Sequence, residues 1–349
     1  MRDIKGTLMY IIKRIVLMLV TLSIIFIIVF TLVRLLPIPE SQGAGKDAET
    51  FYLTQVKLGR MYKGEDGNYY DVPIIQQLFT FVKNLFYPYY RDETGALQEI
   101  SRWGYSWEIE KLSTPTQILT KKLPITIFIN LLSMLVSVPV GLAIGTYMAL
   151  KKNKWQDHVL SILVMVVISV PSFVYAFLIQ YFYAFKWGLA DITRGEWNGT
   201  FADLLRPDML KFLVMPVLSM CFGSIAGYAR YTRAELTEVL TSDFMLLART
   251  KGLSRAQATV RHAFRNSLVP IFPMILGEIL SLMSGSMIIE SIFTVNGVGS
   301  LFLESYQKRD YDVFQFVSVF YIFIGLVGGL LVDISYGLVD PRIRIGGRK

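Results

Sequence analysis

Few side chains in this sequence could do chemistry, and their spacing assembles no catalytic or metal-binding site. The two histidines, His158 and His262, lie far apart, and the single cysteine, Cys221, has no partner for an intrachain disulfide. The text GAGKD at 43–47 lacks the spacing and the Ser or Thr of a phosphate-binding loop, and neither GxSxG nor HExxH occurs. The sequence therefore predicts a protein that is not itself an enzyme, without catalytic residue, cofactor or metal.

Three carboxylates stand out because they lie in or beside strongly apolar stretches: Glu278, Glu290 and Asp333. An ionised side chain at the centre of a membrane helix costs about 2.5–3.5 kcal/mol on insertion scales. We expect Glu278 to face an aqueous cavity or a subunit interface, and a neutral, packed glutamate is the alternative. Glu290 and Asp333 are expected near the membrane surfaces as hydrogen-bond acceptors. All three are candidates for a pathway or an interface.

The elements that carry these residues are predicted membrane spans. The chain is 53% hydrophobic and 18% charged, with a mean hydropathy of +0.46, which excludes a soluble domain, a disordered chain and a secreted disulfide scaffold. A span needs about 20 apolar residues. Six stretches qualify: Ile15–Val33, Leu123–Leu150, Val159–Phe185, Phe212–Ala229, Leu268–Ile289 and Val313–Val332. The first is too long for a signal-peptide core, so we expect a retained anchor.

The connecting segments alternate in charge along the chain. The net charge is +12 over one set, which comprises 1–14, 151–158, 230–267 and 340–349. It is −2 over the alternating set, which comprises 37–122, 186–211 and 293–312. Lys and Arg concentrate in cytoplasmic loops. The sequence therefore predicts a multi-pass protein of the cell membrane with both termini in the cytoplasm.

Residues 37–122 are too many for a plain connector, and we expect a small extracytoplasmic subdomain. The Asp-Gly pair within 61–72 predicts a hairpin, and the helical spacing of apolar residues in 74–90 predicts an amphipathic helix at the membrane interface. Six aromatic residues suit the headgroup level of a membrane: Tyr87, Tyr89, Tyr90, Trp103, Tyr105 and Trp107. A folded cap with ordinary aromatic packing is one interpretation, and a docking surface for a substrate-delivering partner is the other.

Small residues recur four apart in the predicted spans, a spacing that lets helices approach closely in lipid. The sets are Gly141/Gly145, Gly223/Gly227, Gly277/Ser281/Gly285 and Gly325/Gly329. Prolines also lie inside the spans, at 139, 171, 216 and 273, and permit kinks. The pattern predicts a packed helical bundle.

The segment 230–270 is the most informative part of the chain. We expect a first helix over Thr232–Lys251 with a break near Thr241–Asp243, followed by Gly252 in the left-handed conformation. A second helix is expected to begin at Ser254, with Gln257 completing a capping box.

The apolar residues of this second helix follow the spacing of one helix face. They are Leu253, Ala256, Val260, Ala263 or Phe264, and Leu268. A short basic helix between two spans could anchor to anionic lipid. A rigid knob that enters a groove on a soluble partner is the more specific interpretation.

The stretch DFMLLARTKGLSRAQATVRHAFRNSLVP (243–270) resembles the cytoplasmic signature loop of binding-protein-dependent ABC importer permeases, in the variant of the oligopeptide and dipeptide permeases. Residues 9–37, 290–313 and 332–344 are also similar to these permeases, and the first of them is similar to the B-type membrane subunit. The resemblance covers the chain except 37–122. Where the general permease loop has Glu-Ala-Ala and a following Gly, this chain has Leu246, Leu247 and Ala248, so that only Ala248 and Gly252 match.

The resemblance implies an all-α membrane protein: a permease of the type I ABC importers with six transmembrane helices and an extracytoplasmic insertion. It implies a peptide substrate, a homologous second permease subunit, two cytoplasmic ATPase subunits and an extracytoplasmic peptide-binding lipoprotein. The residues expected to couple to an ATPase are Asp243, Ala248, Gly252, Leu253, Ser254, Ala256, Val260, Arg261 and Arg265.

The expected organisation has four parts. They are a tail and first span over 1–36, the loop subdomain over 37–122, a five-helix core over 123–339 that contains the loop 230–270, and a cytoplasmic tail over 340–349. A secondary transporter or channel that acts without ATPases is the alternative, and it would need an internal repeat or broken half-helices. An intramembrane enzyme is a third class, which the missing motifs disfavour.

Overall fold

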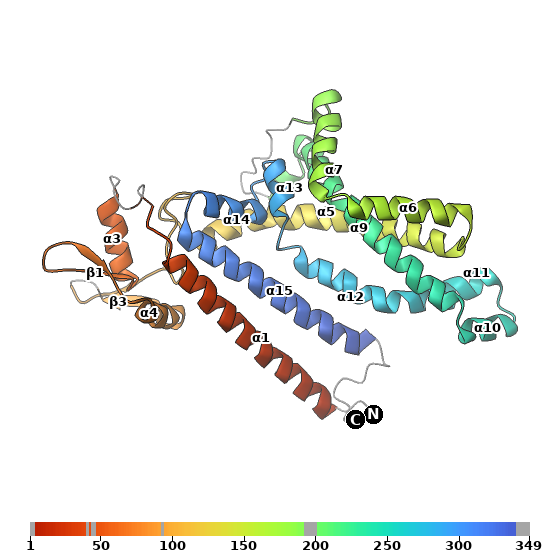
Figure 1. The fold of residues 1–349 in the computed structure, drawn as a ribbon, viewed down its shortest axis with the longest axis horizontal. Helices are drawn as coiled ribbons and strands as arrows, with labels where there is room; N and C mark the ends of the chain where they lie inside the picture. Colours follow the sequence, from red (N-terminus) through yellow and green to blue (C-terminus); the bar gives the residue numbers. More distant parts are fainter. Residues whose placement is uncertain (1–3, 40–41, 43–46, 92–93, 192–200, 340–349) are drawn as a thin grey trace. The chain divides into compact units, whose positions relative to one another are not determined.

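A computed structural model describes the chain except residues 1–3, 40–41, 43–46, 92–93, 192–200 and 340–349, so the predicted C-terminal tail lies outside the described residues. Among these described residues, five helices are long and apolar enough to cross a membrane, or six if one bent pair counts as a single span. The chain is thus a mostly helical, multi-pass membrane protein. The long helices are α1 (Ile4–Arg34), α5 (Pro115–Leu150), α9 (Pro207–Leu240), α12 (Arg265–Ser281) and α15 (Tyr311–Val339) (Figure 1).

The third predicted span is not one straight helix. It consists of α6 (Trp155–Ser169), then α7 (Ser172–Ile179) with its π-helical continuation η1 (Gln180–Lys186), and the two parts are bent by 93°. The break falls at Val170 and Pro171, both extended. Proline lacks a backbone N–H and disfavours helical geometry in the residue before it, which accounts for the bend.

The fifth predicted span, Leu268–Ile289, is also wrong in its bounds. Helix begins at α11 (Arg255–Ala258), continues through η2 (Thr259–Phe264) and α12, and ends at Ser281. Residues 282–286 then break the helix, and Gly285 has a φ of +66°. A short helix, α13 (Met287–Ile292), follows. Glu290 therefore lies on a separate element and not at the end of the span.

The chain divides into two compact units. We call Met1–Met18, Leu123–Ser300 and Ile324–Lys349 the core unit, and Leu19–Lys122 with Leu301–Phe323 the loop unit. The centre of the core unit is a buried apolar cluster contributed by α5, α7, α9 and α13, in which Phe212, Met215 and Phe293 are fully buried. The four-residue helix α8 (Phe201–Leu204) adds Leu204 to this cluster.

Only some of the recurring small residues bring helices together. A Cβ on Gly141 would lie 2.5 Å from the Cβ of Tyr228, and one on Gly145 would lie 2.5 Å from the carbonyl oxygen of Ala229. These two glycines therefore permit α5 and α9 to cross closely. Gly223, Gly325 and Gly329 make no such contact, because no atom of the described chain lies within 4 Å of the position of a Cβ there.

The loop unit is folded around aromatic side chains. Its elements are α3 (Ala48–Lys57), β1 (Met61–Lys63), β2 (Tyr69–Asp71), α4 (Ile74–Phe86), β3 (Tyr89–Arg91), β4 (Leu97–Glu99) and most of α14 (Val298–Gln307), with parts of α1 and α15. Strands β1 and β2 form the predicted antiparallel hairpin, with Met61 opposite Asp71. The helix predicted over 74–90 ends at Phe86 because Pro88 follows, and β3 pairs with β4 in a second hairpin that was not predicted from the sequence.

Candidate functional site

A cavity of about 440 Å³ lies among α5, α9 and α12 in the core unit. Its wall combines small and polar residues with three larger apolar ones. The lining residues are Asn130, Ser133, Met220, Gly223, Ser224, Gly227, Tyr228, Met274, Gly277, Glu278, Ser281 and Leu282. Gly223, where no atom of the described chain lies within 4 Å of the position of a Cβ, thus leaves open space at the cavity.

Glu278 is the carboxylate in the wall of this cavity, and it is half-buried. It accepts a hydrogen bond from the phenolic hydroxyl of Tyr228, whose side chain is almost completely buried. Nearby, the Asn130 side-chain amide donates to the carbonyl oxygen of Leu282 over 2.8 Å, where α12 ends. The structure therefore places Glu278 at a cavity with a specific partner on α9, and no pattern in the sequence identified Tyr228 as that partner.

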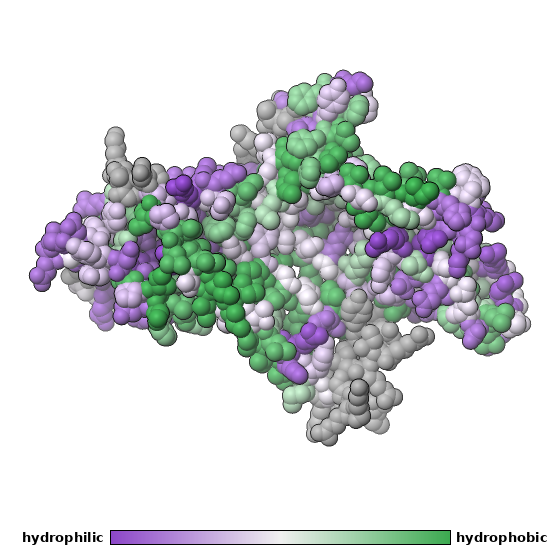
Figure 2. All heavy atoms as spheres, viewed as in Figure 1, coloured by the Kyte–Doolittle hydropathy of each residue, from purple (hydrophilic) through white to green (hydrophobic). Residues whose placement is uncertain are grey.

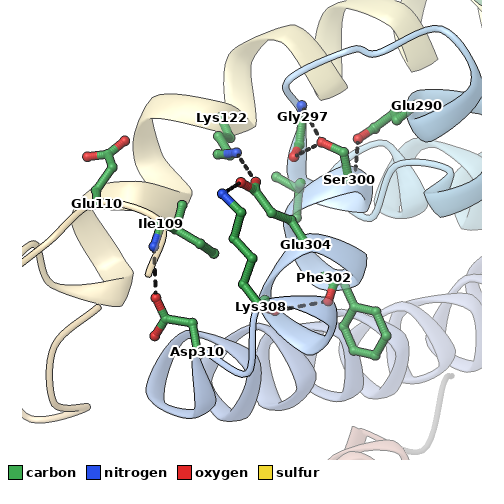
Figure 3. A network of polar contacts seen from close by, with 12 residues as sticks. Ile109, Glu110, Lys122, Glu290, Gly297, Ser300, Phe302, Glu304, Lys308 and Asp310 are labelled. Carbon is green, nitrogen blue, oxygen red and sulfur yellow. Dashed lines mark hydrogen bonds and ion pairs between the residues drawn. The ribbon is translucent and has the colours of Figure 1, made fainter. Parts of the chain in front are cut away.

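Glu290 lies in a different environment, a closed polar cluster (Figure 3). Its side chain is 3% exposed and accepts hydrogen bonds of 3.0 Å from the Thr126 hydroxyl and from the Ser300 backbone N–H. Gly285 and Gly297 approach so closely that a Cβ on either would collide with the carboxylate. Burial raises the pKa of Glu290 to about 7, against the lowering effect of these hydrogen bonds. Glu290 thus holds α13 to α5 and to the segment that follows α13.

Asp333 lies on α15, where it forms an ion pair with Arg14 of α1. The Nη1–Oδ2 distance is 2.9 Å, and both side chains are partly exposed. The three carboxylates singled out in the sequence therefore lie at three separate places and do not form one cluster. Within the part of the chain that the structure describes, no group of three or more His, Cys, Asp or Glu residues could hold a metal ion.

The segment between α9 and α12 has the predicted helix–glycine–helix arrangement. Helix α9 ends at Leu240, and α10 (Asp243–Thr250) begins after a short break. Gly252 has a φ of +91°, as expected of a glycine that ends a helix. The Ser254 hydroxyl accepts from the Gln257 backbone N–H, and the Gln257 side chain accepts from the Ser254 N–H, so the predicted capping box is present.

We call residues 243–265 the coupling segment, and its inner side packs on the core unit. A buried cluster joins Met245 and Ala248 of α10 and Ala258 and Ala263 of the second helix to Leu236 of α9. Leu253 packs against the same cluster. Ala248 and Leu253, two of the residues expected to couple, thus contribute to the support of the segment.

The outer side of the coupling segment presents both apolar and charged side chains (Figure 2). Val260 is 69% and Leu246 64% exposed. The remaining expected coupling residues are exposed too: Asp243, Gly252, Ser254, Ala256, Arg261 and Arg265. The predicted single apolar face is wrong, because Ala263 points inward whereas Val260 points outward. The π-helical turn η2 causes this difference, since each π turn contains an extra residue and shifts the face that follows.

An ion pair that was not predicted from the sequence joins α6 to α9. Arg233 of α9 binds the carboxylate of Asp157 in α6 through two hydrogen bonds, of 2.5 and 2.7 Å. Asp157 is fully buried and also accepts from the Asn153 N–H. A buried carboxylate needs such a partner. The sequence signals for this ion pair were an acid, Asp157, after a short polar turn and a base, Arg233, at the start of a basic segment. The pair ties the first turn of α6 to α9.

A bundle of membrane spans around a cavity, with a structured connection between two of the cavity-lining helices, is typical of a transport subunit. The chain belongs to the family of binding-protein-dependent transport system inner membrane components, whose match covers residues 141–345. Members are permease subunits of ABC importers, in which separate ATPase subunits hydrolyse ATP.

Relatives are similar over nearly their full length. The dipeptide transport system permease protein of Lactococcus lactis is 32% identical over 96% of this chain and 99% of its own length. The corresponding dipeptide permease of Bacillus subtilis is 30% identical, over 96% and 98%. The oligopeptide transport system permease protein of Haemophilus influenzae is 28% identical, over 96% and 99%.

Proposed function

We propose that this chain is a membrane subunit of an ATP-driven importer of dipeptides or oligopeptides and that it forms half of the translocation pathway. The relatives named as dipeptide and oligopeptide permeases, which match along almost the whole chain, support the substrate class. The proposed partners are a homologous second permease subunit, two cytoplasmic ATPase subunits and an extracytoplasmic peptide-binding lipoprotein.

One observation supports this mechanism above the others: two of the three helices that line the cavity, α9 and α12, are joined by the coupling segment. Helix α9 carries Tyr228 and then runs a further 12 residues, about 18 Å, to its end at Leu240. The continuous helix from Arg255 to Ser281 carries Glu278. A displacement of the coupling segment is therefore transmitted along both helices to the cavity wall.

The exposed side of the coupling segment is the proposed contact with an ATPase subunit. Ala256, Val260, Leu246 and Leu247 would enter a cleft on that subunit, while Arg261 and Arg265 would pair with its acidic groups. Nucleotide binding would close the ATPases and move both coupling segments. The membrane subunits would then alternate between inward-open and outward-open states, to which peptide and nucleotide bind with different affinities.

Purification from native membranes and transport in proteoliposomes test this proposal. The chain, isolated in mild detergent, is expected to bring down ATPase subunits, and peptide uptake by the reconstituted complex is expected to require ATP and to resist a proton ionophore. The alternative secondary transporter predicts the reverse: an isolated chain that transports, and uptake that the ionophore abolishes.

A further inference from the structure

An apolar groove opens on the loop unit, between α4 and the adjoining parts of α1 and α15. Its volume is about 680 Å³, within the range of about 300–1,000 Å³ typical of small-molecule sites. Every lining residue except Ser23 is apolar or aromatic, and the Ser23 hydroxyl donates to the Leu19 carbonyl of its own helix over 2.8 Å. The wall of the groove is therefore almost entirely hydrocarbon, and a ligand that fits it must be apolar.

Helix α4 exposes a stripe of apolar side chains. Ile75, Phe79, Val82 and Phe86 are 70%, 71%, 41% and 85% exposed, whereas its buried residues are Gln77, Phe81 and Asn84. These apolar residues repeat at intervals of three or four and so form one stripe. Figure 2 shows a continuous hydrophobic surface over α4 and the adjoining part of α1. A stripe of this kind is usually covered by lipid or protein.

The position of the groove along α1 and α15 indicates what covers it. Arg34 and Asp312, which lie at the ends of the two spans, form a buried ion pair and mark one level of the loop unit. Phe26 lies eight residues before Arg34, and Phe320 lies eight residues after Asp312, so both are about 12 Å along their helices from that level. The hydrocarbon core of a bilayer is about 30 Å thick. With Arg34 and Asp312 at the surface of the hydrocarbon core, the groove would lie at the depth of one leaflet's acyl chains.

The inner wall of the groove is a cluster of packed aromatic rings. Phe81 of α4 packs on Phe26 and Phe30 of α1, with ring centroids 5.3 and 5.5 Å apart. Trp103 packs on Phe81 at 5.2 Å and on Phe316 of α15 at 5.0 Å. At the C-terminal end of α4, Tyr87 and Tyr89 are exposed, as is usual at the headgroup level of a membrane.

From this arrangement we propose that α4 is immersed in the bilayer and that the groove between α4, α1 and α15 binds an acyl chain of a membrane phospholipid. The bound chain covers the exposed stripe of α4, and the loop unit is thereby anchored to the membrane. This proposal does not depend on the transported substrate or on the ATPase partners.

Quenching by phospholipids with brominated acyl chains tests the position of α4. In the full-length chain in lipid nanodiscs, with all native tryptophans replaced by Phe, a single tryptophan is placed by Phe86→Trp or, as the control, by Tyr62→Trp on the β1–β2 hairpin. Both positions are exposed aromatic residues of the loop unit. The Phe86→Trp chain is expected to lose at least half of its fluorescence and the Tyr62→Trp chain almost none. Equal, weak quenching at both positions would place α4 in water and overturn the proposal.

Native mass spectrometry tests the groove itself. Val82→Trp fills the groove, whereas Ile24→Trp changes a similarly exposed aliphatic residue of α1 that does not line it. Release from nanodiscs is expected to leave one fewer bound phospholipid on Val82→Trp than on Ile24→Trp. Equal lipid retention would overturn the proposal. Loss of the quenching in the Phe86→Trp chain on assembly with the second permease subunit would also overturn it, because protein would then cover the groove.

Discussion

At the scale of single residues, Glu278 is the carboxylate that lines the cavity of the proposed pathway. Its hydrogen bond from Tyr228 requires an oxygen acceptor but no charge, and glutamine supplies that acceptor with the same shape. Peptide uptake by Glu278→Gln is therefore expected to stay within about threefold of the parent chain. Glu278→Lys removes the acceptor and places a cation at the cavity wall, and it is expected to lower uptake at least about tenfold.

The measurement is uptake at matched amounts of assembled complex. Loss of uptake by Glu278→Gln in a complex that still assembles would show that the carboxylate charge itself acts on the substrate or on a partner. Normal uptake by Glu278→Lys would remove Glu278 from the pathway.

Glu290 gives the chain a predictable pH dependence. The pKa of Glu290 in the folded protein is about 7, above the value of about 4.3 for an unfolded chain. The folded state binds the proton more tightly, so the contribution of Glu290 to stability is greatest below about pH 4.3 and falls as the pH rises toward 7. Glu290→Gln removes this titration. The thermal midpoint in detergent is expected to fall between pH 5 and pH 8 for the parent chain by more than for the variant, and equal shifts would contradict the prediction.

At the scale of elements, the turn at Gly252 sets the direction of the second coupling helix. A Cβ there would meet no atom within 4 Å in the described chain, so a side chain would act only through the backbone, where positive φ costs about 1–2 kcal/mol. Gly252→Val is expected to insert normally but to lose ATPase co-purification or to uncouple ATP hydrolysis from uptake. Gly252→Ala is expected to be milder.

A second glycine provides the control for this substitution. Gly67 has a φ of +82° and equally open surroundings, but it lies in the β1–β2 hairpin. Gly67→Val is expected to leave ATPase binding intact, because it imposes similar strain outside the coupling segment. Normal ATP-driven uptake by the Gly252→Val chain would show that the coupling segment is only a connector.

Substitutions at two glycines on facing helices can test helix packing and the transport pathway separately. Gly223 lines the cavity, and no atom of the described chain lies within 4 Å of the position that a Cβ would take there, whereas Gly141 is in contact with Tyr228. Gly223→Leu is expected to preserve the expression and thermal stability of the chain while it narrows the cavity and lowers peptide uptake. Gly141→Leu is expected to destabilise the bundle by about 1–3 kcal/mol or more, because the α5–α9 crossing must open. Unimpaired uptake by Gly223→Leu would exclude the cavity as the route of the peptide.

At the scale of the whole molecule, the charge distribution predicts the orientation in the membrane. Single cysteines at Glu65, in the β1–β2 hairpin, and at Lys152, in the turn before α6, would both replace residues that are exposed in the structure. In a Cys221→Ser background, an impermeant thiol reagent is expected to label Glu65→Cys in intact cells and Lys152→Cys only after permeabilisation. Labelling of Lys152→Cys in intact cells would reverse the orientation.

Most of the local structure could be predicted from the sequence, because the signals are local. Long apolar runs predict spans whatever surrounds them, and the Ser254–Gln257 capping box and the left-handed Gly252 depend only on neighbouring residues. The hairpin at 61–71 depends similarly on its Asp-Gly turn. The identity of the family also follows from such local stretches.

The tertiary structure decided which residues far apart in the sequence are in contact. The partner of Glu278 is Tyr228, fifty positions earlier, and the partner of Asp157 is Arg233; no periodicity contains that information. Whether a glycine packs against a helix or lines a cavity depends on the helix opposite. Gly141 and Gly223 differ for this reason. The π turn in η2 moves the residues that follow it away from the helix face that the 3.6-residue period predicts for them. The sequence did not reveal this turn, because tertiary packing selects it and local propensity does not include that packing.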